Sequence, residues 1–127
     1  MLIAQIFATS QYATRSTQYL INRNTQYALL NTPLMKPTIT IEYCPKCRWM
    51  LRAAYMAQEL LTTFEDDLYG VLLHPSEING RYSIYVDDKR IFDRREFGRF
   101  PEVKELKQLV RDNVNPGRSL GHSDKVS

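Results

Sequence analysis

The chain has 127 residues, of which 43% are hydrophobic and 24% charged, the composition of one folded domain with a core of its own. No apolar run approaches the roughly 18 residues of a membrane helix, so we expect no membrane span. The net charge of +3 comes from Arg15, Arg23 and Lys36, since the 14 other basic residues match the 14 acidic ones. A neutral globular part argues against a nucleic-acid-binding protein.

The first 37 residues differ from the rest of the chain. They are rich in Ser, Thr, Gln and Asn, they contain arginine, and they have no Asp or Glu. That composition is typical of an organellar transit peptide, and a disordered extension fits it too. We therefore expect an N-terminal extension over residues 1–37. The protein is expected to be cytoplasmic, or mitochondrial if residues 1–36 are a transit peptide.

The folded domain, expected over residues 38–115, begins with a strand and a helix. The stretch "TITIEY" (38–43) alternates apolar and polar residues and is rich in β-branched ones, which predicts a strand. Apolar residues then recur at spacings of three and four up to Phe64. This pattern predicts an amphipathic helix over about residues 45–64, with Pro45 in its first turn.

Three more strands and a second helix complete the predicted domain. The apolar run "LYGVLLHP" (68–75) predicts a strand covered on both faces, and "RYSIYVDDKRIFD" (81–93) a hairpin that turns at residues 87–89. A charged loop follows, then a helix after Pro101 and a flexible polar tail over residues 116–127. The order β-α-β-β-β-α predicts an α/β, thioredoxin-like fold with a small mixed sheet.

Cys44 and Cys47 are the only cysteines, and they lie where the first strand is expected to give way to the helix. Unpaired N–H groups at a helix start favour a thiolate, and Lys46 and Arg48 add positive charge, while Glu42 opposes it from the strand side. Cysteines in such motifs have a pKa of roughly 3.5–7.5, against about 8.5 for a free thiol. We predict that Cys44 and Cys47 are catalytic, with Cys44 attacking and Cys47 resolving.

Other interpretations of the pair have less support. A structural zinc site needs four ligands, and only His74 and His122 are available to join the cysteines. A structural disulfide over four residues gains little closure entropy, and two inert buried thiols are the remaining alternative. We therefore predict no metal and no bound cofactor. Trp49, next to the motif, is expected to pack in the core or to flank the site.

Three stretches carry a family resemblance. "TITIEYCPKCRWMLRAAYMAQELL", "GRYSIYVDDKRIFDRREFGRFPEVKELKQLVRD" and "LGHSD" closely resemble the Rdx family of selenoprotein W, T and H relatives, and in particular cysteine-only selenoprotein W-like members. The resemblance implies a thioredoxin-like fold and a redox role. Family members with selenium carry selenocysteine at the second motif position, here Cys47, which suggests the reverse order of attack. The chain departs from thioredoxin where Asn79, Gly80 and Arg81 stand in place of a cis-proline.

We therefore predict a thiol–disulfide redox protein that takes electrons from glutathione or the thioredoxin system and passes them to oxidised protein substrates. The alternative is an interaction module in which the redox state of the pair gates partner binding with little turnover.

Overall fold

The computed structural model describes residues 35–124, so most of the N-terminal extension expected over residues 1–37 lies outside it. In chain order the elements are strand β2 (Thr38–Tyr43), helix α3 (Met50–Thr63), strands β3 (Gly70–Pro75), β4 (Tyr82–Val86) and β5 (Lys89–Asp93), helices α4 (Arg94–Phe97) and α5 (Val103–Val114), and the 3-10 turn η2 (Gly121–Asp124). This sequence of elements contains the predicted β-α-β-β-β-α order. None of the helices in this range is long and apolar enough to cross a membrane.

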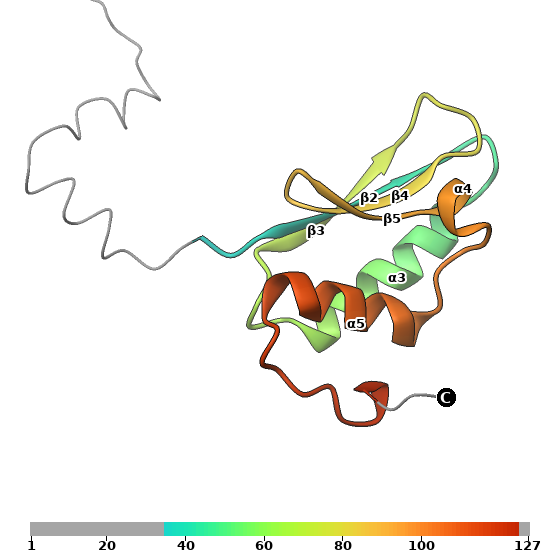
Figure 1. Ribbon diagram of the computed structural model, residues 1–127. Helices are drawn as coiled ribbons and strands as arrows, with labels where there is room; N and C mark the ends of the chain where they lie inside the picture. The colour runs from blue at the N-terminus through green and yellow to red at the C-terminus, as the bar shows by residue number, and fades with distance from the viewer. Residues whose placement is uncertain (1–34, 125–127) are drawn as a thin grey trace, which may run out of the picture. The chain divides into compact units, whose positions relative to one another are not determined.

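The four strands form one mixed sheet in the order β3-β2-β4-β5. Strands β2 and β3 are parallel, as the connection through α3 requires, and β4 is antiparallel to both β2 and β5. The β4–β5 hairpin turns through Asp87 and Asp88, with φ 52° at Asp87, so the turn is one residue shorter than predicted. Figure 1 shows both long helices, α3 and α5, on the same side of this sheet.

The hydrophobic core lies between that sheet face and the two helices. Alternate residues of β2 and β4 point into it as opposing pairs, Ile41 with Ile84 and Tyr43 with Tyr82, and all four are buried. Helix α3 contributes Ala53, Met56, Ala57 and Leu60, and α5 contributes Leu106 and Val110. No helix of the described chain covers the opposite face, where Leu72 of β3 is 54% exposed. The prediction that β3 is covered on both faces is therefore wrong.

The start of α3 differs from the prediction. The helix begins at Met50, with Trp49 as its N-cap, and not near residue 45. The residues before it form a turn in which the N–H groups of Arg48 and Trp49 donate to the carbonyl oxygens of Pro45 (3.0 Å) and Cys44 (3.4 Å). Arg48 has φ 64°, a left-handed conformation that an α-helix cannot contain. The two cysteines are thus carried by a turn between β2 and α3.

The segment predicted as a charged loop contains the short helix α4. The Asp93 side chain caps this helix by accepting the N–H of Glu96 at 3.2 Å, and Gly98, at φ 76°, ends it. Helix α5 then starts with a capping box formed by Glu102 and Glu105, two residues after Pro101. The prediction of a single charged loop is therefore wrong, because Asp93 caps one helical turn in this segment.

The described part of the C-terminal tail folds back onto α5. Asp124 pairs with Arg111, Gln108 donates to the carbonyl oxygen of Ser123, and Leu120 packs against the core. These contacts explain why a polar segment takes up a defined turn at η2. Flexibility of residues 116–127 is a statement about motion and stays a prediction.

Candidate redox site

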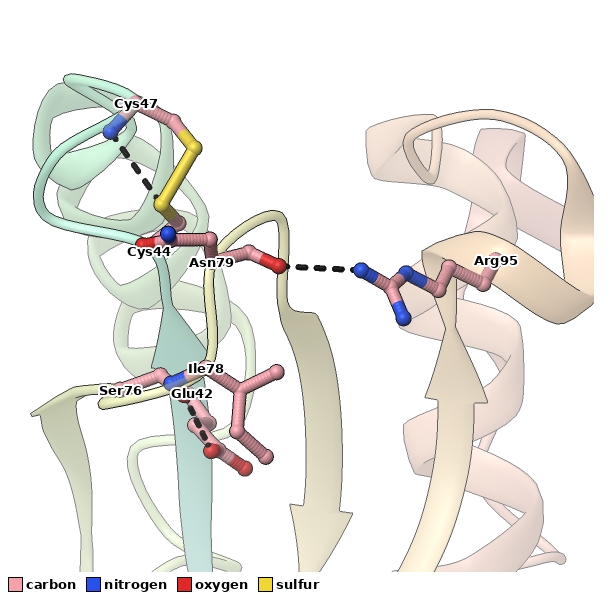
Figure 2. Close-up of a disulfide and its surroundings, with 7 residues drawn as sticks. All are labelled: Glu42, Cys44, Cys47, Ser76, Ile78, Asn79 and Arg95. Atoms are coloured by element: carbon pink, nitrogen blue, oxygen red, sulfur yellow. Dashed lines mark hydrogen bonds between the residues drawn. A yellow bond between two sulfur atoms is a disulfide. The ribbon is translucent and has the colours of Figure 1, made fainter.

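Cys44 and Cys47 are joined as a disulfide, with their Cα atoms 5.3 Å apart. Figure 2 shows Cys44 directly at the end of β2 and Cys47 farther out on the turn. Cys44 has no exposed surface, whereas Cys47 is partly exposed. The two residues therefore differ in accessibility, and Cys47 is the one open to the surroundings.

One backbone group stabilises negative charge on the buried sulfur. The N–H of Cys47 donates to Cys44 Sγ at 3.2 Å (Figure 2). A hydrogen bond of this kind favours the thiolate over the neutral thiol when the disulfide opens. The macrodipole of α3 contributes less than the sequence suggested, because its effect falls off within the first turn and α3 starts six residues after Cys44.

Glu42 lies just before the motif, but its carboxylate is occupied. Ser76 donates its hydroxyl to one oxygen (2.7 Å) and Tyr85 donates its hydroxyl to the other (3.1 Å). The sequence suggested that Glu42 would oppose a thiolate at Cys44. Instead, these hydrogen bonds make it an anchor for the segment that follows β3, a role that sequence reasoning missed.

That segment, residues 76–81, is held next to the motif turn from two sides. The Ser76 N–H donates to the carbonyl oxygen of Tyr43 at 2.7 Å, and the Ser76 hydroxyl accepts the N–H of Ile78 at 3.0 Å. At the far end of the segment, Arg95 donates to the carbonyl oxygen of Asn79 at 3.0 Å (Figure 2). Gly80 has φ 79°, and a Cβ there would come within 3.3 Å of the Arg95 guanidinium. Every peptide bond of the described chain is trans.

Trp49 ties the motif turn to the C-terminal half of the domain. Its ring packs edge to face on Phe100, with ring centres 4.8 Å apart, and on Tyr82, at 6.3 Å. The Arg94 guanidinium lies over the Trp49 ring at 4.9 Å, and Arg52 lies over Phe100 at 3.9 Å. Trp49 is thus a packing residue beside the site. Its partners Phe100 and Arg94 are about 50 residues away in the chain, so no local pattern could reveal them.

Neither histidine joins the cysteines in a metal-binding cluster among the described residues. His74 is exposed on β3, and His122 is exposed in η2, whose neighbouring residues contact α5. Within residues 35–124 no three His, Cys, Asp or Glu side chains gather as a metal site would require.

Comparisons with known proteins agree with this geometry. The model of the Rdx family matches residues 38–112. A solved structure of a Bordetella parapertussis protein is 49% identical, with a TM-score of 0.60 over 62% of this chain and 99% of that one. A selenoprotein W-related protein from Vibrio cholerae is 46% identical, with a TM-score of 0.61 over 63% of this chain and 99% of that one.

One curated relative is longer. The chain is 30% identical over 78 residues to "Putative esophageal gland cell secretory protein 6" of Heterodera glycines, and the match spans 61% of this chain but only 30% of that protein. The two solved structures support the α/β, thioredoxin-like fold. Because the family model covers more than half of the sequence and includes both cysteines, this chain belongs to the Rdx family.

Proposed function

We propose that the protein is a thiol–disulfide redox protein in which Cys47 exchanges with substrates and Cys44 resolves. The observation that carries the proposal is the difference in accessibility within one disulfide: Cys44 is fully buried and Cys47 is partly exposed. The hydrogen bond from the Cys47 N–H to Cys44 Sγ supports the same order, because it stabilises Cys44 as the thiolate that leaves or attacks inside the protein. This order is the reverse of the one predicted from thioredoxin.

In the reductive direction, the Cys47 thiolate attacks one sulfur of a substrate disulfide. The substrate S–S bond breaks, a mixed disulfide forms at Cys47, and the first substrate thiolate leaves. The Cys44 thiolate then attacks Cys47 Sγ, which closes the Cys44–Cys47 disulfide and releases the second substrate thiolate. Two electrons pass from the protein to the substrate.

The oxidised protein needs two electrons from a thiol donor to start again. The donor thiolate attacks the accessible Cys47 sulfur, and Cys44 leaves as a thiolate stabilised by the Cys47 N–H. A second donor thiol then reduces the mixed disulfide at Cys47. We propose glutathione or the thioredoxin system as this donor and the cytoplasm as the compartment, because cytoplasmic thiols are kept reduced. Mitochondria are the alternative if residues 1–36 act as a transit peptide.

Trapping of mixed disulfides tests the order of attack. A Cys44→Ser variant keeps the exchanging thiol but lacks the resolving one, so it should accumulate disulfide-linked substrates that are visible on non-reducing gels. A Cys47→Ser variant should trap few, and the double variant none. Trapping by Cys47→Ser alone would reverse the assignment.

A second measurement tests the redox role itself. Mild oxidation of the reduced wild-type protein should remove two mass units as the disulfide closes, and the oxidised protein should be reduced by glutathione or thioredoxin. A pair that stays reduced under oxidants that close other Cys-x-x-Cys motifs would contradict the proposed function.

A further inference from the structure

A hollow opens beside the turn that carries the disulfide. Its volume is 370 Å³, and its walls are Tyr43, Pro45, Arg48, Met50 and Leu51. Pro45 and Arg48 flank Cys47 in the turn, and the last two lining residues open helix α3. Any group seated in this hollow therefore lies against the segment from which Cys47 is partly exposed.

The helix side of the hollow is apolar and uncovered. Leu51 is 82% exposed and Met50 is 52% exposed, and Tyr55, one turn after Leu51, is 52% exposed. The α3 residues that are buried in the core are different ones, including Ala53 and Met56. Covering large apolar side chains at this exposure with another surface lowers the free energy, because it removes apolar area from water. Neighbouring side chains of this kind form a contact patch.

The turn side of the hollow is basic. Arg48 belongs to the lining, and Lys46 is exposed two residues earlier. Neither side chain has an ion pair within residues 35–124, and the nearest acid in the chain, Glu42, is held by Ser76 and Tyr85. An apolar wall next to unpaired positive charge complements a ligand that combines an apolar side chain with a carboxylate.

We propose that this hollow is a substrate subsite for polypeptide disulfides. It takes a large apolar side chain that neighbours the substrate cysteine, with an Asp or Glu close by facing Arg48. The inference rests on the proposed function, because it assumes that the Cys47 thiolate attacks the cysteine sulfur so placed. It names the substrate class as protein disulfides flanked by apolar and acidic residues. Glutathione disulfide has no large apolar side chain to fill the hollow.

Two chromogenic peptides test the apolar wall. Gly-Phe-Cys-Phe-Glu and Gly-Ser-Cys-Ser-Glu are prepared as mixed disulfides with thionitrobenzoate. The Cys47 thiolate of the reduced full-length protein attacks the peptide sulfur and displaces thionitrobenzoate, whose absorbance gives the second-order rate constant. The Phe peptide should react about tenfold faster than the Ser peptide, the effect of burying part of one aromatic ring.

Variants test whether the preference for the Phe peptide depends on residues that line the hollow. Leu51→Ser should reduce the preference for Phe to about twofold or less. Arg48→Gln should abolish a preference for the Glu peptide over a Gly-Phe-Cys-Phe-Lys analogue. The matched control is Leu61→Ser, an apolar residue of the same helix that is 42% exposed and about 15 Å farther along its axis. This control should keep the tenfold preference.

The outcomes separate the subsite from the proposed function. Equal wild-type rates with the Phe and Ser peptides overturn the subsite and leave the redox role intact. A faster reaction with the thionitrobenzoate mixed disulfide of glutathione than with the Phe peptide also overturns it. If none of these disulfides reacts, the proposed function is overturned, and the subsite with it.

Discussion

Replacing Tyr82 by Phe should stabilise the protein. Tyr82 is fully buried in β4, and its hydroxyl has no hydrogen-bond partner among the described residues. Burial raises the pKa of this phenol well above its usual value, and the nearby Arg52 charge lowers it only in part. The hydroxyl therefore stays neutral and unpaired in the core. The rest of the ring packs on Trp49 and Phe100, and those contacts survive in Phe.

The expected gain follows from the cost of the unpaired group. A buried hydroxyl without a partner costs about 1–3 kcal/mol, so its removal should raise the free energy of unfolding by about 1 kcal/mol. For a domain of this size that corresponds to a rise of about 4–8 °C in Tm. Urea unfolding followed by circular dichroism measures the difference, with the disulfide kept oxidised in every sample.

A matched variant lies three residues along the same strand. Tyr85 donates its hydroxyl to Glu42 at 3.1 Å, so Tyr85→Phe should lower the free energy of unfolding by about 1–2 kcal/mol. The same chemical change should therefore have opposite signs at the two positions. A loss of 1 kcal/mol or more in Tyr82→Phe would mean that the Tyr82 hydroxyl is hydrogen-bonded, and it would refute the reasoning.

Three further variants probe other contacts. Burial favours a raised pKa at Asp93, but the hydrogen bonds from Ser83 and the Glu96 N–H, with the charges of Arg90 and Arg81, hold the pKa below its ordinary value. The ionised Asp93 therefore stabilises the fold above about pH 4, and this stabilisation is lost as pH falls through the folded pKa. Asp93→Asn should lower the free energy of unfolding by about 1–3 kcal/mol at pH 7. In urea unfolding, the difference in free energy between wild type and variant should narrow below pH 4. Ser76→Ala removes two hydrogen bonds, so native-state amide exchange at Ile78 should quicken about tenfold or more; an unchanged rate would contradict the anchoring role. Leu120→Ala should lower the free energy of unfolding by about 1–2 kcal/mol, and no loss would mean that residues 116–124 do not hold their contact with the core.

The strands could be predicted because their signal is local. Alternation over residues 38–43 and β-branched residues suffice to identify β2 and its inward face. Which face the helices cover is not local. Both α3 and α5 pack on one side of the sheet, whereas the apolar run of β3 predicts a strand buried on both faces.

The helix boundaries show where local rules compete. Pro45 fits the first turn of a helix, but apolar periodicity begins only at Met50. The left-handed φ of Arg48 could not be predicted, because arginine, unlike glycine, is not typical of that conformation. Helix α4 is too short for any periodicity. Its one signal was the spacing of Asp93 and Glu96, which matches a capping box.

The site divides in the same way. The Cys-x-x-Cys spacing predicts that Cys44 and Cys47 can form a disulfide, and the structure pairs them. Their unequal burial depends on how the turn folds over the end of β2, and thus on contacts between distant segments. Sequence reasoning therefore predicted the disulfide pair, whereas the catalytic role of the two cysteines and their order of attack stay predictions, the order by analogy with thioredoxin.

The late start of α3 has a consequence for how this scaffold can evolve. Because the turn from Pro45 to Arg48 precedes the first hydrogen bond of the helix, its residues are not part of the α3 ladder. Substitutions at these positions are therefore expected to change the surroundings of the disulfide without breaking a hydrogen bond of the helix. The turn that carries the disulfide can thus vary in sequence while helix α3 stays the same.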